Sequence, residues 1–335
     1  MPDTIKLTAI SSRAWEHPAD RAALNALRAL PGFDEAVRRV MGFLGERGVR
    51  QLFLANAVRV GPQQRPKLYS LYSEVLDTLD APDRWDLYVS QTPLANAMAV
   101  GFQRPFIVFN SGMLEIMDED ERRAVLAHEV GHIMSGHPTY TTLAIILLTI
   151  GVANIPLLAG LALLPFELGL LEWYRKSEFS ADRAALLGTQ DIRKTQSVNL
   201  KLAGGPVLDD PIDLDAFLAQ AREYETMAGP WDRVWQFVNT VLRTHPFATV
   251  RAGELQRWID TGEYERILSG EYQRRGDEPP PLANDFKAAG GYYEDRAREA
   301  MNTVGEMVAR ARAAFNEAWT SGDSSGGSGP ANPTQ

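Results

Sequence analysis

The sequence predicts an α+β fold that is mainly helical, with a small antiparallel sheet and an apolar helical hairpin. Apolar residues recur at helical spacing through most of residues 19–80 and again through 167–270. Three short runs of strand composition lie together between residues 84 and 111. Residues 138–166, which lie between two predicted helices, contain no charged side chain, and this favours apolar helices folded against each other.

The composition is that of a globular protein, and it excludes several kinds of function. Of the 335 residues, 45% are apolar and 23% are charged, which allows a large packed core. The net charge of −9 argues against nucleic acid as a partner. There is no cysteine, so disulfides, thiolate zinc sites and a cysteine nucleophile are excluded. The first residues lack the basic end and apolar core of a signal peptide, so we expect a cytoplasmic location or one at the cytoplasmic face of a membrane.

The first half of the chain is predicted to form helices and then the sheet. An N-terminal helical region covers residues 1–64, and proline or glycine marks the helix ends, as at Pro31-Gly32 and Ala81-Pro82. Gly101 and Pro105 separate strand runs and favour antiparallel connections. The runs are RWDLYVS (84–90), ANAMAVG (95–101) and PFIVFNS (105–111).

The second half is predicted to form helices up to the tail. Four acids at 118–121 begin a long helix, where they favour its N-terminal dipole. A second helix over 167–188 ends at a glycine cap, and further helices follow to about 270. The expected segments after the N-terminal region are a main domain (65–273), a linker with a last helix (274–320) and a disordered tail (321–335). The apolar side of the last predicted helix can pack on the rest of this protein or on a partner chain. The sequence specifies no oligomeric state.

The long helix carries the motif His128-Glu129-Val130-Gly131-His132. Residues four apart lie on one face of a helix, so both imidazoles can reach one zinc ion. Zinc lowers the pKa of a bound water to about 7, and a carboxylate such as Glu129 can take its proton during attack on a carbonyl. The alternative is an ordinary core helix with two hydrogen-bonded histidines. A di-iron site is disfavoured, because no other glutamate has a histidine three residues later.

A catalytic zinc site needs a third ligand, and the segment SEFSADRAA offers one. Glu178 and Asp182 lie four apart on one helical face. Glu178 can complete a His₂Glu site, and Asp182 can accept a hydrogen bond from the far nitrogen of a ligand histidine. Taken alone, the two acids fit a solvated face better. Together with the histidine motif they favour the metal site.

An ordered set of motifs resembles the HtpX / CAAX-prenyl-protease family of zinc metallopeptidases, which are zincins of the gluzincin type. The resemblance covers roughly residues 65–255. Its motifs are NAMAVG, IVFNSGMLEIMDEDERRAVLAHEVGH, the apolar stretch, SEFSADRAAL and THPFATVR. It implies a zincin-like core and a zinc-dependent endopeptidase acting on proteins or peptides. It also implies one Zn²⁺ per chain on His128, His132 and Glu178, with Glu129 as the general base.

The resemblance also implies roles around the metal. Asp182 would orient a ligand histidine, and Asn96 would lie on an edge strand that pairs with the substrate backbone. His245 matches the family's later His-Pro, either as a donor to the oxyanion or as a displaceable fourth zinc ligand. Arg251 follows at the expected position as a substrate-binding residue. For these last two, the alternative is a His-Pro at the start of a helix with a surface arginine. His137 is expected to be structural, off the ligand face, and His17 to be incidental in a loop.

The apolar stretch 143–166 is long enough for one membrane span. The predicted ligands flank it, however, so a single crossing would separate Glu178 from the two histidines. A helical hairpin over 141–171 remains, either packed on the domain or in peripheral contact with a membrane face. Two functions compete with the peptidase: a zinc-bearing chaperone-like scaffold with a latent site, and a zinc hydrolase acting on a non-peptide bond.

Overall fold

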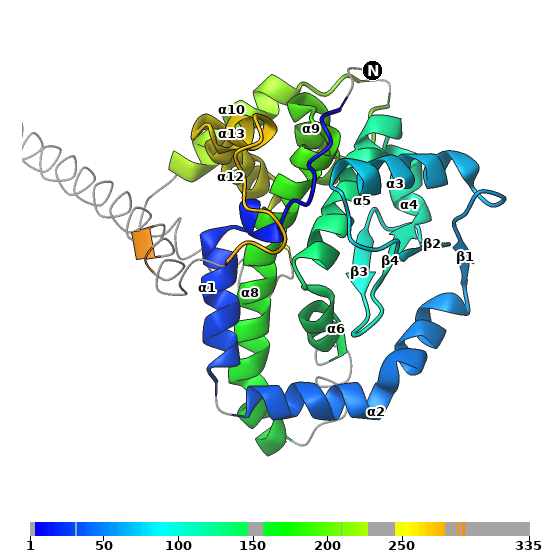
Figure 1. The fold of residues 1–335 in the computed structure, drawn as a ribbon, viewed down its shortest axis with the longest axis vertical. Coiled ribbons are helices and arrows are strands. Elements are labelled where there is room, and N and C mark those ends of the chain that lie inside the picture. The colour runs from blue at the N-terminus through cyan, green and yellow to red at the C-terminus, as the bar shows by residue number, and fades with distance from the viewer. Residues whose placement is uncertain are drawn as a thin grey trace, which may run out of the picture.

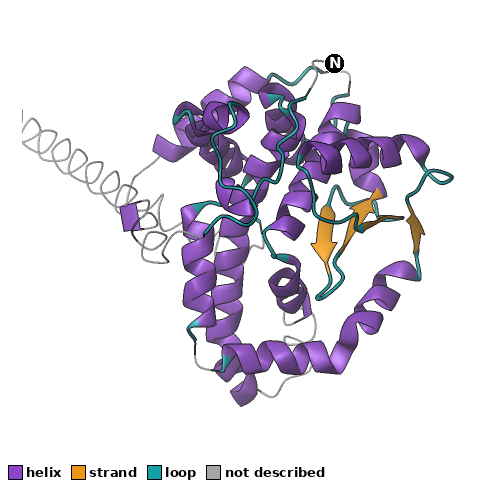
Figure 2. Cartoon of the chain, viewed as in Figure 1, coloured by secondary structure: helices purple, strands orange, loops and turns teal. Residues whose placement is uncertain are grey.

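The computed structural model describes residues 4–30, 32–146, 157–208, 210–226 and 245–278, together with 287, 290 and 291. Helices surround one small sheet (Figure 2), so the predicted mainly helical α+β class is confirmed. The helices are α1 (Pro18–Arg28), α2 (Phe33–Leu54), α3 (Pro66–Thr78), α4 (Ser111–Ile116), α5 (Glu119–Met134), α6 (Pro138–Ile146), α8 (Leu157–Thr189), α9 (Ile192–Gly204), α10 (Leu214–Thr226), α12 (Ala248–Asp260) and α13 (Glu263–Leu268). The strands are β1 (Ala57–Arg59), β2 (Asp86–Ser90), β3 (Ala97–Val100) and β4 (Phe106–Asn110).

The sheet is mixed, so the prediction of an antiparallel sheet is wrong. Its strand order is β1-β2-β4-β3, and β2 runs parallel to β4. The β3 and β4 strands form the expected antiparallel hairpin, and Ala97 lies opposite Phe109. In sequence β3 comes between β2 and β4, but in the sheet β4 lies between the other two. β2 and β3 therefore pair with opposite edges of β4. β1 lies in a region predicted to be helical, and three residues are too few to show the alternation of a strand.

β3 is the edge strand of the sheet on the side of the candidate site. Within the described strands, β3 pairs with β4 alone, so its other edge carries no strand. β4 lies between β2 and β3 and is buried at all five positions. α5 packs beside β3 (Figure 1).

α5 is the central helix, and its sequence defines where it begins. Asp118 accepts a hydrogen bond from the backbone of Glu121 at 2.9 Å, and Glu121 accepts one from the backbone of Asp118 at 2.8 Å. This reciprocal capping satisfies two amides of the first turn. From Ala124 to Ile133 every residue of α5 is buried, because α3, β3 and α8 cover it.

α5 and α8 approach each other closely at two glycines. A Cβ added to Gly131 would lie 2.4 Å from the Cβ of Ala184, and one added to Gly188 would lie 2.5 Å from the Cβ of Ala127. Real Cβ atoms do not approach this closely, so both positions require glycine at this helix spacing. The close contact brings the histidine motif of α5 against Glu178 and Asp182 of α8.

We expect Gly131→Ala to destabilise the protein, although alanine is the better helix former. Forcing a methyl group between two packed helices costs about 1–3 kcal/mol, which exceeds the helix-propensity gain of about 1 kcal/mol. Gly42 in α2 is the matched control, because a Cβ there meets nothing within 4 Å. In urea unfolding without added metal, the free energy of unfolding should lie below that of the wild type for Gly131→Ala and at or above it for Gly42→Ala. Equal stabilisation by both substitutions would contradict the close contact.

The predicted apolar hairpin (141–171) lies only partly within the described residues. Its first residues belong to α6 and its last to α8, and 147–156 between them lie outside the description. α8 begins at Leu157, ten residues before the predicted start at 167, and it continues past Pro165. Leu143 and Leu170 are buried in a cluster that includes Leu27 and Phe33 of the N-terminal region. In the described part of the chain, no helix is both long enough and apolar enough to cross a bilayer.

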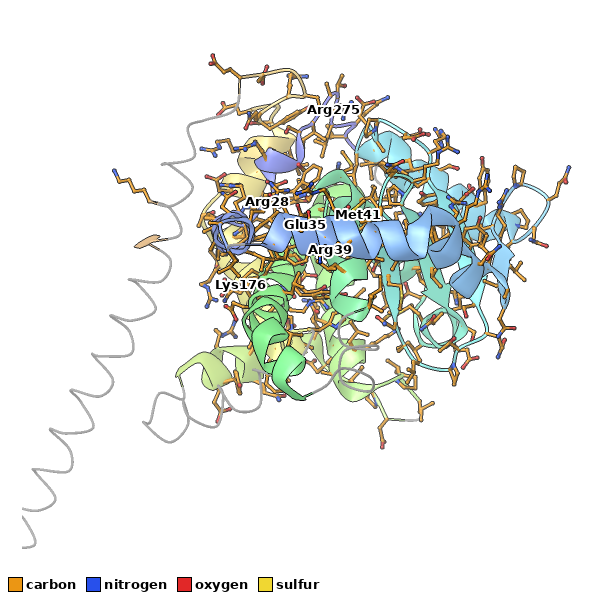
Figure 3. All side chains as sticks on the ribbon, turned by 90° about the horizontal axis from the view of Figure 1, so that it is seen from below. Arg28, Glu35, Arg39, Met41, Lys176 and Arg275 are labelled. Atoms are coloured by element: carbon orange, nitrogen blue, oxygen red, sulfur yellow. The ribbon has the colours of Figure 1, made fainter. Side chains whose placement is uncertain are left out.

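The N-terminal helices pack on the main body. α1 lies along α8 (Figure 1). α2 runs across the face nearest the viewer in Figure 3, where Glu35 and Arg39 are joined by a hydrogen bond of 2.8 Å. The predicted last helix (about 291–319) and the tail (321–335) fall almost wholly outside the described residues, and the domain boundaries stay a prediction.

Candidate metal centre

His128, His132 and Glu178 lie together, as the sequence analysis expects. The two Nε2 atoms are 3.2 Å apart. His128 Nε2 lies 3.5 Å from Glu178 Oε2, and His132 Nε2 lies 3.4 Å from Glu178 Oε1. These ligand atoms all lie within 4.8 Å of one another, and no other group of this kind occurs among the described residues. The three side chains therefore converge on one small volume.

The chemistry of this group fits zinc. Two imidazole nitrogens and one carboxylate are a donor set of catalytic zinc sites. Glu178 is 1% exposed, and its Oε2 accepts no hydrogen bond within the described part of the chain. Burial would raise the pKa of Glu178, but His245, Arg251 and the two ligand histidines hold it well below its ordinary value. A buried, ionised carboxylate with a free lone pair is suited to bind a cation.

Asp182 contacts His128, as predicted. Its Oδ1 lies 3.1 Å from His128 Nδ1, and Arg251 Nε donates to its Oδ2 at 2.9 Å. Because the carboxylate only accepts, Nδ1 of His128 donates and Nε2 is left for a metal. In the metal-free site, burial opposes protonation, but Asp182 and Glu178 together raise the pKa of His128 to about 9. Metal binding at neutral pH therefore displaces a proton from this ring.

Arg251 is buried within the site, so the surface alternative is wrong for it. It is 8% exposed and lies 3.3 Å, through Nη1, from Glu178 Oε2. It also forms two hydrogen bonds with Asp182. Burial would lower the pKa of Arg251, but Asp182 and Glu178 raise it above its ordinary value. The Arg251 guanidinium thus interacts with two buried carboxylates, and its role in substrate binding stays a prediction.

His137 and Asp20 also belong to the surroundings of the candidate metal centre, and no pattern in the sequence indicates Asp20. His137 Nδ1 lies 2.8 Å from His132 Nδ1, and its Nε2 lies 3.1 Å from Asp20 Oδ2. Gly136, with a φ of +73°, ends α5 and turns the chain back, so that the His137 amide bonds to the His132 carbonyl at 3.0 Å. A glycine before a histidine at a helix end is the only signal of this arrangement in the sequence.

Glu129 lines the same cavity as the three candidate ligand side chains and is 4% exposed. Burial is the largest influence on it and raises the pKa of Glu129 to about 7. Its Oε2 accepts no hydrogen bond from the described residues. Glu129 therefore has an oxygen available and a pKa near neutrality, as a general base requires.

A cavity of about 840 Å³ opens onto Glu129 and the three ligand side chains. Asn96, which directly precedes β3, lines it, and so does β3 itself. His245 also lines the cavity, half-buried, with Nε2 3.6 Å from Glu178 Oε1 and its ring packed on Tyr174. Burial lowers the pKa of His245. Both predicted roles of His245, oxyanion donor and displaceable ligand, remain predictions.

Comparison with known proteins finds one family. The sequence model of peptidase family M48 matches residues 62–259. Plastoglobule-localized metallopeptidase 48, a chloroplastic protein of Arabidopsis thaliana, is 36% identical over 260 residues, which are 76% of this chain and 74% of that protein. No solved structure matches the chain.

Shorter matches come from bacterial proteins. Protease HtpX of Acinetobacter baumannii is 46% identical over 54 residues, 16% of this chain and 17% of that protein. A protease HtpX homolog of Streptococcus pneumoniae is 32% identical over 108 residues, 32% of this chain and 34% of that protein.

Proposed function

The chain belongs to peptidase family M48 and is a metallopeptidase, and we propose that it is a zinc-dependent endopeptidase that hydrolyses peptide bonds in proteins or peptides. The observation that supports this most is the convergence of His128, His132 and Glu178 on a cavity that also contains Glu129. When bound, zinc polarises a carbonyl and lowers the pKa of a water to about 7. One zinc ion per chain would be held by the three converging side chains.

The protein's own residues would bind and move protons around this centre. Glu129 takes the proton of the attacking water and passes it to the leaving amine. The imidazole of His245, which lines the cavity, would donate to the oxygen of the scissile carbonyl. Asp182 and Arg251 keep His128 and Glu178 in place during the reaction.

The proposed substrate is an extended peptide bound beside β3. The free edge of a strand offers backbone groups that a peptide can pair with, and this does not depend on the peptide's ends. Asn96 directly precedes that edge, and Arg251, which is buried, also lines the cavity. Binding through the substrate backbone supports cleavage within a chain rather than at its ends.

We propose peripheral contact with the cytoplasmic face of a membrane through 141–171, and a cytoplasmic location stays a prediction. The absence of charge from 138 to 166 supports the contact. The relative from Arabidopsis thaliana is named for plastoglobules.

The proposed activity is tested with the purified full chain loaded with zinc. A peptide blocked at both ends, and casein as an unstructured protein, should be cut at internal bonds. Removal of zinc with a chelator should abolish cleavage, and added zinc should restore it. Bound zinc without cleavage of either substrate, together with tight binding of unfolded protein, would favour the scaffold instead. Cleavage of esters but not of peptides would favour the non-peptide hydrolase.

A further inference from the structure

A chain of hydrogen bonds joins the proposed metal ligand His132 to α1, far away in sequence. His132 Nδ1 and His137 Nδ1 are 2.8 Å apart, and His137 Nε2 is 3.1 Å from Asp20 Oδ2. All three side chains are buried, and both His137 and Asp20 are 2% exposed. Water therefore has little access to these hydrogen bonds, so each ring nitrogen finds its hydrogen-bond partner within the protein.

We propose that Asp20 is a positioning residue for zinc binding, acting through His137 to hold His132 in the tautomer that a metal ligand requires. This inference rests on the proposed zinc site. It assigns a role to a residue of the N-terminal region, which lies outside the segment 62–259 that matches the peptidase family.

Asp20 sets the direction of every hydrogen bond in the chain. Its Oδ1 accepts from Trp173 Nε1 at 2.9 Å, and its Oδ2 accepts from Ser180 Oγ as well as from His137. Burial would raise the pKa of Asp20, but His137, Ser180 and Trp173 lower it, so the group is a carboxylate that only accepts. His137 must therefore carry its proton on Nε2.

The rest of the assignment follows from the chemistry of imidazole. A singly protonated His137 with its proton on Nε2 has a lone pair on Nδ1, so His132 must donate from its own Nδ1. The Nε2 atom of His132, which lies 3.4 Å from Glu178 Oε1, then keeps its lone pair for a metal. The opposite directions would place a hydrogen on His132 Nε2, and a metal could not bind there.

The two proposed ligand histidines are thus oriented in the same way by different parts of the chain. His128 donates directly to the carboxylate of Asp182 on α8. His132 reaches the carboxylate of Asp20 on α1 through one intervening imidazole. α1 is held there because His17 caps it, and the His17 amide donates to Ser180 Oγ at 2.9 Å. Docking of α1 on α8 therefore completes the surroundings of the metal.

Asp20→Asn tests this role with little change in shape. Trp173 can only donate, so the amide oxygen faces Trp173. The amide NH₂ then faces Ser180, whose hydroxyl can accept as well as donate, and His137. His137 must then accept at Nε2 and donate from Nδ1, which forces the wrong tautomer on His132. We expect the zinc Kd, measured by competition with a chelator, to rise about 10–100-fold.

Two further variants separate positioning from structural damage. Leu27→Ala, on the same helix and buried outside the hydrogen-bond chain, should lower the unfolding midpoint of the zinc-free protein and leave its zinc Kd within about threefold of the wild type. Adding Trp173→Phe to Asp20→Asn removes the group that fixes the amide orientation. The double variant should bind zinc more tightly than Asp20→Asn alone, whereas a purely structural role predicts weaker binding.

The tautomers can also be observed in the unaltered protein. In ¹⁵N-histidine-labelled, zinc-loaded wild type, NMR should show His137 protonated on Nε2 and His132 on Nδ1. Protonation of His137 on Nδ1, or an unchanged zinc Kd in Asp20→Asn, would overturn the inference even if one variant folds poorly. Failure of the wild type to bind zinc would instead contradict the proposed zinc site itself, and the inference with it.

Discussion

Glu129→Gln is expected to keep zinc and to lose peptide hydrolysis. Glutamine has nearly the same shape as glutamate, but it cannot take a proton from water. Proton transfer by a positioned side chain contributes about 10²–10⁴-fold to a rate, so kcat/KM should fall by that amount. Glu129 is not one of the three converging ligand side chains, so the zinc Kd should change little. The measurement is kcat/KM on the doubly blocked peptide, with zinc content determined on the same sample.

The stability of the zinc-free variant provides the control for this experiment. The folded protein raises the pKa of Glu129 to about 7, and its ordinary value is 4.5. The folded state therefore binds the proton more tightly, so Glu129 lowers stability progressively as pH rises from about 4.5 to 7. Glutamine does not ionise, so zinc-free Glu129→Gln should be more stable than the wild type at pH 8, by at most about 3 kcal/mol, and similar to it at pH 4. An inactive variant that is less stable at pH 8 would not identify Glu129 as the base. Full activity in a zinc-loaded variant would exclude that role.

Local spacing explains why much of the candidate site could be predicted. His128 and His132 are four apart, as are Glu178 and Asp182, and each pair lies on one face of its helix. Sequence order adds that the two helices flank an apolar stretch. The contact between these two helices requires small residues, and Gly131 within the histidine motif is one of them. These relations are short-range, so they can be read along the chain.

The remaining features depend on contacts between distant segments. Asp20 in the first turn of a helix suggests only a favourable interaction with the helix dipole, and no local pattern indicates that it meets His137. His17 was expected to be incidental, but it is buried and caps α1. The parallel pairing of β2 with β4 is likewise non-local, because the strand between them in sequence pairs on the other side. Such contacts depend on how whole helices and strands pack together, and short sequence patterns do not contain this information.

Glu178→Ala is expected to remove most zinc affinity and, with it, all activity that depends on zinc. Structural zinc sites with four ligands bind with about 10–16 kcal/mol, so one ligand contributes roughly 2.5–4 kcal/mol, or about 10²–10³-fold in Kd. Glu178 is the anionic member of the three converging side chains, so its loss also leaves two neutral imidazoles to hold a dication. The zinc Kd of the purified variant, measured by competition with a chelator, checks this.

Glu172→Ala is the matched control for Glu178→Ala, because it removes a carboxylate from the same helix. Glu172 pairs with Arg175, and its side chain is 45% exposed. Its removal should leave the zinc Kd unchanged, since it takes no part in the metal group. In Glu178→Ala, Arg251 keeps its two hydrogen bonds to Asp182, so the guanidinium is not left as an uncompensated buried charge and the variant should still fold. A folded Glu178→Ala protein that binds zinc as tightly as the wild type would therefore exclude Glu178 as a ligand, and two histidines alone would not make this centre a catalytic zinc site.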